Sequence, residues 1–218
     1  MKYARFVVIG AVVLLGLSAP ACEAEESWSS LASPDGTFRI EFSVGDKGRA
    51  LYRVRRGKDE VVLPSGLGFL EAGGVDWTGG YVKAELGAAE LHDGSWRPVW
   101  GERSLVRDHY RGAVVLFRRP GPLAGLRLEV RAYDSGVAFR YLVGARGEKK
   151  SINIESEKTE FCFTEDHKTW AVYSAQGKYS KVKLSELRSS VERPCVLETG
   201  AGKVIAIAEA ALVDYARM

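Results

Sequence analysis

The stretch FRIEFSV (Phe38–Val44) alternates apolar and polar residues, and this alternation decides the fold class. Successive side chains of a β-strand point to opposite faces, so this segment has one apolar face and one polar face. The apolar positions are Phe38, Ile40, Phe42 and Val44, and the polar positions are Arg39, Glu41 and Ser43. We therefore predict a half-buried strand, bounded by the turn sequences SPDG before it and GDKG after it.

Most of the remaining chain also has the pattern of short strands. The segment ALYRVRRGKDEVVL (residues 50–63) is typical of a β-hairpin with Gly57 and Lys58 at its tip. Further strands are predicted over Tyr81–Leu86, Ala113–Arg118, Leu126–Tyr133, Val137–Val143, Ile152–Ser156, Phe161–Phe163 and Val204–Ala210. Helix is scarce, with one short candidate at Val182–Arg188, and the glycine-rich EAGGVDWTGG (residues 71–80) is predicted to be a surface loop. Short strands linked by turns predict an all-β fold, an antiparallel sandwich.

The N-terminus has the pattern of a secretory signal peptide over residues 1–21. Lys2 and Arg5 precede an apolar run that is too short to span a bilayer, and SAPAC then offers a cleavage site before Cys22. We therefore predict a periplasmic or secreted protein. Lipid anchoring through Cys22 is the alternative, although Ala19, three positions earlier, is smaller than the residue that a lipid-attachment site usually has there.

The composition of the mature chain excludes some classes of partner. Removal of residues 1–21 leaves 218 − 21 = 197 residues, enough for one large or two small domains. Two of the 31 basic residues are lost, so 29 basic residues remain against 28 acidic ones, and the two signs are interleaved. This balance argues against a nucleic-acid partner and against binding to an anionic membrane surface.

The sequence contains no self-contained catalytic constellation. His92, His109 and His167 are scattered without metal-ligand spacing, and there is no nucleophile elbow, CxxC pair or phosphate loop. The motifs alone therefore identify no catalytic residues in this chain. Trp96 and Trp100 of GSWRPVWGE are candidates for stacking on a sugar ring, although sandwich domains more often use tryptophan for packing in the core or a loop.

Two cysteines are candidates for a disulfide. Cys162 and Cys195 are the natural pair in an oxidising compartment, since Cys22 lies beside the cleavage site. The alternative is two separate buried thiols, because the sequence does not show whether the two Cα atoms lie within bridging distance.

The C-terminal stretch VIAIAEAALVDY (residues 204–215) carries one carboxylate, Glu209, within an apolar run. We predict a strand that is apolar on both faces and therefore lies in the centre of a sheet. A buried carboxylate has to be paired, protonated or bound to a metal, whereas a glutamate at the end of a strand usually meets solvent or an arginine. The pattern alone leaves these alternatives open for Glu209.

Six segments, taken in one order along the chain, resemble the N-terminal domain of glycoside hydrolase family 97, whose members are bacterial enzymes that act on α-glucosides and α-galactosides. The segments are SPDGTFRIEFSV, LYRVRRGKDEVVLPSGLGF, WRPVWGE, RLEVRAYDSGVAFRYLV, ESEKTEFCF and IAIAEAALVDYARM. RAYDSGVAFRY and EAALVDYARM carry most of the resemblance.

The resemblance implies a fold for this chain and places the catalytic residues of the family in another domain. Residues 22–218 are expected to form an antiparallel super-sandwich similar to that of galactose mutarotases. In the family this domain precedes a (β/α)₈ barrel that carries the catalytic carboxylates, and this chain has no alternating βαβ pattern from which a barrel could be built. We therefore expect a C-terminally truncated domain that ends before the catalytic barrel and is inactive by itself.

The resemblance also assigns a role to Glu209. In the family a glutamate of the N-terminal domain reaches the active site of the barrel and helps to hold a calcium ion, and it matches Glu209 in AEAAL. Calcium takes roughly six to eight oxygen ligands, so we expect calcium in the full-length parent enzyme and no tight binding to this chain alone. The expected partners are the barrel domain and, indirectly, an α-linked oligosaccharide.

Two other functions fit the same pattern. A free-standing periplasmic carbohydrate-binding or structural sandwich would need an aromatic platform of its own, for which Trp96 and Trp100 are the candidates. A mutarotase-like enzyme would share the fold, but the matched segments lack a convincing pair of a histidine and a carboxylate.

Overall fold

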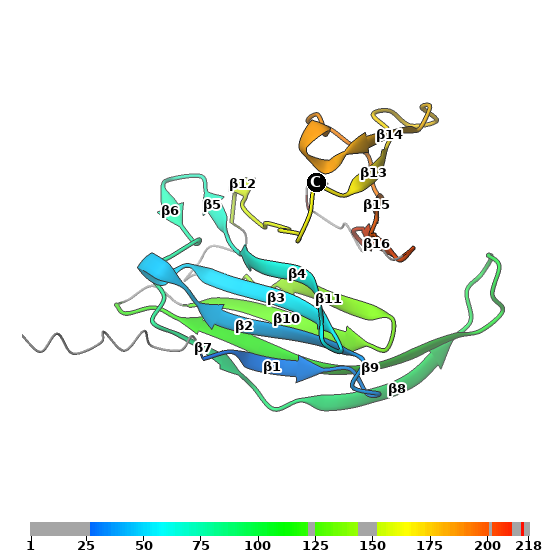
Figure 1. Ribbon diagram of the computed structural model, residues 1–218. Coiled ribbons are helices and arrows are strands. Elements are labelled where there is room, and N and C mark those ends of the chain that lie inside the picture. The colour runs from blue at the N-terminus through cyan, green and yellow to red at the C-terminus, as the bar shows by residue number, and fades with distance from the viewer. Residues whose placement is uncertain (1–26, 122–124, 144–151, 201, 211–214, 216–218) are drawn as a thin grey trace, which may run out of the picture.

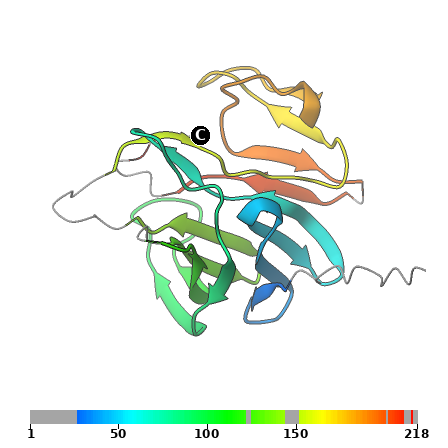
Figure 2. The same cartoon turned by 90° about the vertical axis from the view of Figure 1, so that its left-hand side faces the viewer.

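The protein is built almost entirely from antiparallel strands, as the sequence predicts. The computed structural model describes residues 27–121, 125–143, 152–200, 202–210 and 215. Figure 1 shows two larger sheets packed face to face, with two smaller sheets on the side of β4, and Figure 2 shows the last strands as a separate layer over the sandwich. The helical content of the described ranges is two short 3₁₀ turns, at Asp46–Gly48 and Leu184–Glu186.

The first large sheet has the strand order β1-β2-β3-β4. Its strands are β1 (Ser29–Ala32), β2 (Phe38–Val44), β3 (Ala50–Arg56) and β4 (Asp59–Gly66). The bounds of β2 are those of the predicted strand, and the predicted hairpin is formed by β3 and β4. Gly57 lies at the hairpin tip with φ +60°, a left-handed conformation that glycine adopts readily.

The second large sheet has the order β11-β10-β9-β7, and β8 also pairs with β9. Its strands are β7 (Lys83–Leu86), β8 (Glu90–Trp96), β9 (Val106–Arg118), β10 (Leu126–Tyr133) and β11 (Gly136–Tyr141). The predicted strand Ala113–Arg118 is only the C-terminal part of β9, because the preceding residues of this strand, VRDHYRG, lack apolar alternation. Paired with β8, they extend past the sandwich as the β8–β9 arm, residues 90–112 (Figure 1, right).

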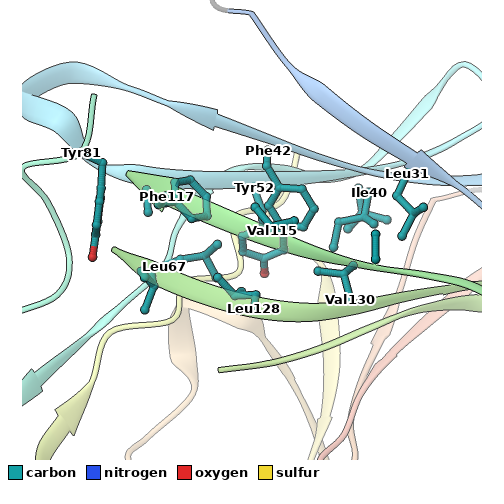
Figure 3. Close-up of a cluster of buried hydrophobic side chains, with 14 of the residues drawn as sticks. Leu31, Ile40, Phe42, Tyr52, Leu67, Tyr81, Val115, Phe117, Leu128 and Val130 are labelled. Carbon is teal, nitrogen blue, oxygen red and sulfur yellow. The ribbon is translucent and has the colours of Figure 1, made fainter. Parts of the chain in front are cut away.

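The core lies between the inner faces of the two large sheets (Figure 3). Alternate residues of β2 and β3 meet alternate residues of β9 and β10, which is the arrangement that a period of two along each strand produces. The rings of Phe42 and Phe117 pack edge to face with their centroids 6.3 Å apart. The other fully buried large side chains include Leu31, Ile40, Tyr52, Leu67, Phe69, Val115, Leu128 and Val130.

The polar face of β2 is open to solvent at Arg39 but covered at its other two positions, which corrects one detail of the sequence prediction. Glu41 and Ser43 are both buried, because the segment before β1 lies over them. Arg53 donates from Nε to Oε2 of Glu41 at 2.7 Å, and its guanidinium lies 4.2 Å from the ring centroid of Trp28. The Ser43 hydroxyl donates to the carbonyl of Ser27 at 3.2 Å. The buried polar groups are therefore satisfied by residues distant in sequence.

The glycine-rich segment 71–80 is not simply a surface loop. It contains part of a small sheet with the order β12-β5-β6, whose strands are β5 (Phe69–Glu71), β6 (Val75–Asp76) and β12 (Ile154–Glu157). Trp77 follows β6, is buried, and packs on Phe69 with ring centroids 5.6 Å apart. Gly68 permits this approach, since a Cβ atom there would lie 2.5 Å from the carbonyl oxygen of Trp77.

The fourth sheet has the order β14-β13-β15-β16. Its strands are β13 (Lys168–Ala171), β14 (Ser180–Lys183), β15 (Cys195–Glu198) and β16 (Val204–Ile207). The short helix candidate at Val182–Arg188 contains only the 3₁₀ turn at Leu184–Glu186, and its first residues belong to strand β14. The prediction of a buried central strand at Val204–Ala210 is wrong: β16 stands at the end of the sheet order, and Val204 is exposed.

The predicted signal peptide, residues 1–21, and Cys22 lie outside the described residues. Within the described part of the chain, no helix has the length and apolar character needed to cross a membrane.

We expect Phe117→Ala to lower the free energy of unfolding by about 3–5 kcal/mol, because the substitution leaves a cavity between the two sheets. Urea denaturation followed by circular dichroism measures this change. The matched control is Leu91→Ala on the arm, where the side chain is exposed and a change of less than about 0.5 kcal/mol is expected. Similar losses for the two variants would contradict the assignment of the core.

Candidate functional site

Glu209 and Arg193 are brought together by the register of the β15–β16 hairpin. Cys195 lies opposite Ile207 at one end of this pair of strands. Arg193 precedes this end of β15 by two residues, and Glu209 follows the same end of β16 by two residues. Arg193 donates from Nε to Oε2 of Glu209 over 2.8 Å.

This ion pair is largely shielded from water. The Glu209 side chain is 11% exposed and the Arg193 side chain is 19% exposed. Of the alternatives that the sequence left open for a buried carboxylate, the structure therefore shows pairing with an arginine. Arg193 also lies near Glu192, with Nη1 3.9 Å from a carboxylate oxygen.

A chain of hydrogen bonds lies near the pair. It leads from Tyr215 to Tyr141, which packs against the main core. Tyr215 donates from its hydroxyl to Oε2 of Glu157 at 2.7 Å. Burial is the main reason that the pKa of Tyr215 is raised, and the negative charges of Glu157 and Glu209 raise it further. Glu157 accepts a hydrogen bond from Thr159, whose hydroxyl oxygen lies 2.7 Å from that of Tyr141. The Tyr215 phenol therefore stays protonated as a hydrogen-bond donor.

Arg193 also lines an open pocket of about 220 Å³. The polar residues around it include Ser174, Gln176, Tyr179 and Glu192, whose side chains can donate and accept hydrogen bonds. Arg193 therefore stands between this pocket and Glu209. Such a lining suits a small polar molecule better than an apolar one.

The described residues do not form a complete calcium site around Glu209. Calcium needs roughly six to eight oxygen ligands. In the part of the chain that the structure describes, no group of three or more His, Cys, Asp or Glu side chains is arranged to hold a metal ion. Among the described residues, the Glu209 carboxylate is held by Arg193.

The two candidate tryptophans both lie on the β8–β9 arm. Trp96 is the last residue of β8 and is 54% exposed, and Trp100 lies in the loop between β8 and β9 and is 87% exposed. Neither tryptophan is therefore packed in the core, which is one of the two packing positions that the sequence favoured, and Trp100 lies in a loop. The reason is that this end of the arm extends beyond the residues of β9 that pair with β7 and β10.

The predicted disulfide is not formed in this structure. Cys162 and Cys195 are both free thiols, and Cys162 is exposed. The backbone of Cys162 pairs with that of Leu63 in β4 as an isolated β-bridge, whereas Cys195 belongs to β15 in the fourth sheet. The alternative of two separate thiols therefore describes them, except that Cys162 is exposed and Cys195 is only partly buried.

We expect Arg193→Met and Glu209→Gln to be thermodynamically coupled. Each single substitution removes the ion pair and leaves the other polar side chain in a shielded position. The double substitution should therefore lower the free energy of unfolding by less than the sum of the two single substitutions. A double-mutant cycle by urea denaturation should give a coupling energy of about 1–3 kcal/mol.

The exposed pair formed by Lys203 and Asp59, with 2.9 Å between its charged atoms, is the matched control for this cycle. The cycle built from Lys203→Met and Asp59→Asn should show a smaller coupling, because solvent screens exposed pairs. Coupling as small at Arg193 and Glu209 would contradict the buried ion pair.

Comparison with known proteins agrees with this architecture. The sequence matches the family described as Glycosyl-hydrolase 97 N-terminal over residues 31–218. It is 25% identical to the retaining alpha-galactosidase of Bacteroides thetaiotaomicron over 232 aligned residues, which cover 99% of this chain and 32% of that protein. The chain thus spans about a third of the length of this curated relative.

Solved structures of glycoside hydrolase family 97 enzymes are also similar to this chain. A glycoside hydrolase family 97 enzyme from Pseudoalteromonas sp. strain K8 in complex with acarbose superposes with a TM-score of 0.73 at 29% identity, covering 86% of this chain and 29% of that one. A complex of an enzyme of this family from the same strain with panose gives a TM-score of 0.72 at 29% identity and the same coverage. A beta-arabinopyranosidase at 18% identity, with a TM-score of 0.73, shares the fold.

The family match extends from β1 to the end of the chain and includes both large sheets, the β8–β9 arm and the Arg193–Glu209 pair. The strand order agrees with the antiparallel sandwich that the resemblance implied. The chain belongs to glycoside hydrolase family 97, of which it represents the N-terminal domain.

Proposed function

We propose that this chain serves as the N-terminal domain of an exported, calcium-dependent α-glycosidase and that Glu209 supplies one ligand to the calcium ion. The observation that carries the proposal is the position of Glu209, whose carboxylate is held at the end of β16 by Arg193. The similarity to a retaining alpha-galactosidase, and to family members solved with panose and acarbose, supports an α-glycoside as the substrate class.

Arg193 has a positioning role in this proposal. Its guanidinium fixes the Glu209 carboxylate in one orientation and compensates its charge while the site is incomplete. The carboxylate keeps further lone pairs that are available to a cation. Calcium, when bound, would supply a fixed positive charge in the site.

The domain by itself is proposed to be catalytically inactive. The matched relatives are about three times as long as this chain, and the resemblance places their catalytic carboxylates on a barrel domain. The role proposed for this domain is therefore to bring Glu209, on a rigid sheet, to an active site formed with that barrel.

Export rests on the N-terminal pattern. A positively charged start, a short apolar run and the sequence SAPAC support cleavage before Cys22 and a periplasmic or secreted location. Lipid attachment at Cys22 would keep the same domain at a membrane surface.

We expect Glu209→Gln to weaken calcium binding about tenfold or more when this domain is joined to a catalytic barrel. A suitable protein is a chimera in which this chain replaces the matched third of the Bacteroides thetaiotaomicron enzyme. The amide keeps the shape of the side chain but removes its negative charge, and calcium affinity falls as the number of charged ligands falls. Isothermal titration with calcium measures the change.

Glu198→Gln is the matched control in the same chimera. Glu198 lies in β15 and is paired with Lys181 and Trp170, so its substitution should leave calcium affinity unchanged. Unchanged calcium affinity in the Glu209→Gln chimera would overturn the proposed ligand role.

A second candidate function is a free-standing carbohydrate-binding module. The observation that favours it is the exposure of Trp96 and Trp100 on the β8–β9 arm. Exposed tryptophans next to polar groups are the side chains on which sugar rings stack.

A further inference from the structure

Three aromatic side chains form a row across the second sheet. His92 of β8 lies opposite Tyr110 of β9, and Tyr110 lies opposite Tyr133 of β10. The ring centroids are 4.8 Å apart in the first pair and 5.0 Å apart in the second. The row lies on the face away from the core, because the neighbouring residues Ala113 and Ala132, which have the opposite parity, are buried inside.

Two glycines let these rings lie close to the backbone. A Cβ atom at Gly94 would lie 2.9 Å from Nε2 of His92, and a Cβ atom at Gly112 would lie 3.0 Å from Cε2 of Tyr110. Each ring therefore occupies the space that a side chain at the glycine would take. The rings therefore form an aromatic surface close to the backbone of the sheet, and they do not project away from it.

Trp96 extends this surface along the arm. It lies two residues beyond Gly94 on β8, so its side chain is on the same face as His92. The tryptophan is 54% exposed, and Figure 1 shows this end of the arm projecting clear of the sandwich. We call Trp96, His92, Tyr110 and Tyr133, with the glycines between them, the arm platform.

Polar groups border the arm platform. Asp108 lies with Oδ2 3.3 Å from Nε2 of His92. The guanidinium of Arg131 lies 4.7 Å from the ring centroid of Tyr110 and donates to Oε1 of Glu129 at 2.9 Å. The border therefore offers both hydrogen-bond donors and hydrogen-bond acceptors.

This combination fits a sugar better than the other classes of ligand. A pyranose ring has an apolar face of C–H groups that packs on an aromatic ring, and hydroxyls around its rim that need both donors and acceptors. A low, open surface also suits a chain of such rings, whereas a drug-like or apolar ligand needs a concave pocket.

We propose that the arm platform binds a neutral oligosaccharide, separately from the Glu209 region. Trp96 provides the main stacking surface, and Asp108 and His92 bond the hydroxyls of the bound sugar. The inference rests on the proposed function only for the choice of an α-linked gluco- or galacto-oligosaccharide as the ligand.

The test is isothermal titration of the purified chain with maltoheptaose and with an α-galacto-oligosaccharide, in the presence of a calcium chelator. We expect saturable binding of at least one of the two, and Trp96→Ala should raise the Kd about tenfold or more. Gly94→Leu, which inserts a side chain where the His92 ring lies, should raise it similarly while circular dichroism shows the fold retained.

Trp170→Ala is the matched control, because Trp170 is also partly exposed but belongs to β13 in another sheet. It should leave the Kd unchanged. The proposal would be overturned by absence of binding to both sugars, by equal losses for Trp96→Ala and Trp170→Ala, or by a loss that occurs only with Trp100→Ala in the loop. Calcium and hydrolysis play no part in this measurement, so its outcome is independent of the test on Glu209.

Discussion

The packing of two antiparallel sheets through their alternating inner faces is the constraint on which the rest of this structure depends. Ile40 and Phe42 of β2 face Val115 and Phe117 of β9, and all four side chains are fully buried. Because side chains alternate along a strand, a shift of one residue in any register would turn an apolar row toward solvent. The registers of the central strands are therefore strongly specified, and everything outside the core is positioned relative to them.

The outer faces of the same strands are then free to carry polar and aromatic groups. On β2 this face holds Glu41, which accepts a hydrogen bond from Arg53, and the Arg53 guanidinium packs on the ring of Trp28. On β9 and β10 it holds the arm platform, where the Trp96 side chain at the end of β8 is 54% exposed. The same alternation that builds the core thus separates structural surfaces from surfaces that are available for binding.

The Arg193–Glu209 pair follows from register in a smaller sheet. The β15–β16 hairpin aligns the two residues just beyond its strands, and the largely buried position strengthens their interaction compared with an exposed pair. A carboxylate held in this way is suited to act at a boundary between domains, where a flexible side chain would lose its orientation. The proposed calcium ligand and the proposed sugar surface lie on different sheets, so each can be tested without disturbing the other.

The local alternation of residues was enough to predict the sandwich, the bounds of β2 and β10, and the β3–β4 hairpin, because strand periodicity and turn chemistry are properties of neighbouring residues. The same kind of reasoning singled out Glu209 and the exposed Trp96. It missed β8 and the polar half of β9, whose residues show no apolar alternation, and it placed β16 in the centre of a sheet. The partners Arg193 for Glu209 and His92 for Tyr110 were decided only by the tertiary structure, since strand pairing brings together residues that are 16 and 18 positions apart. Apolar alternation in the sequence therefore determined the core strands. The pairing of the strands decided which side chains meet, because contact across a sheet depends on register and not on proximity along the chain.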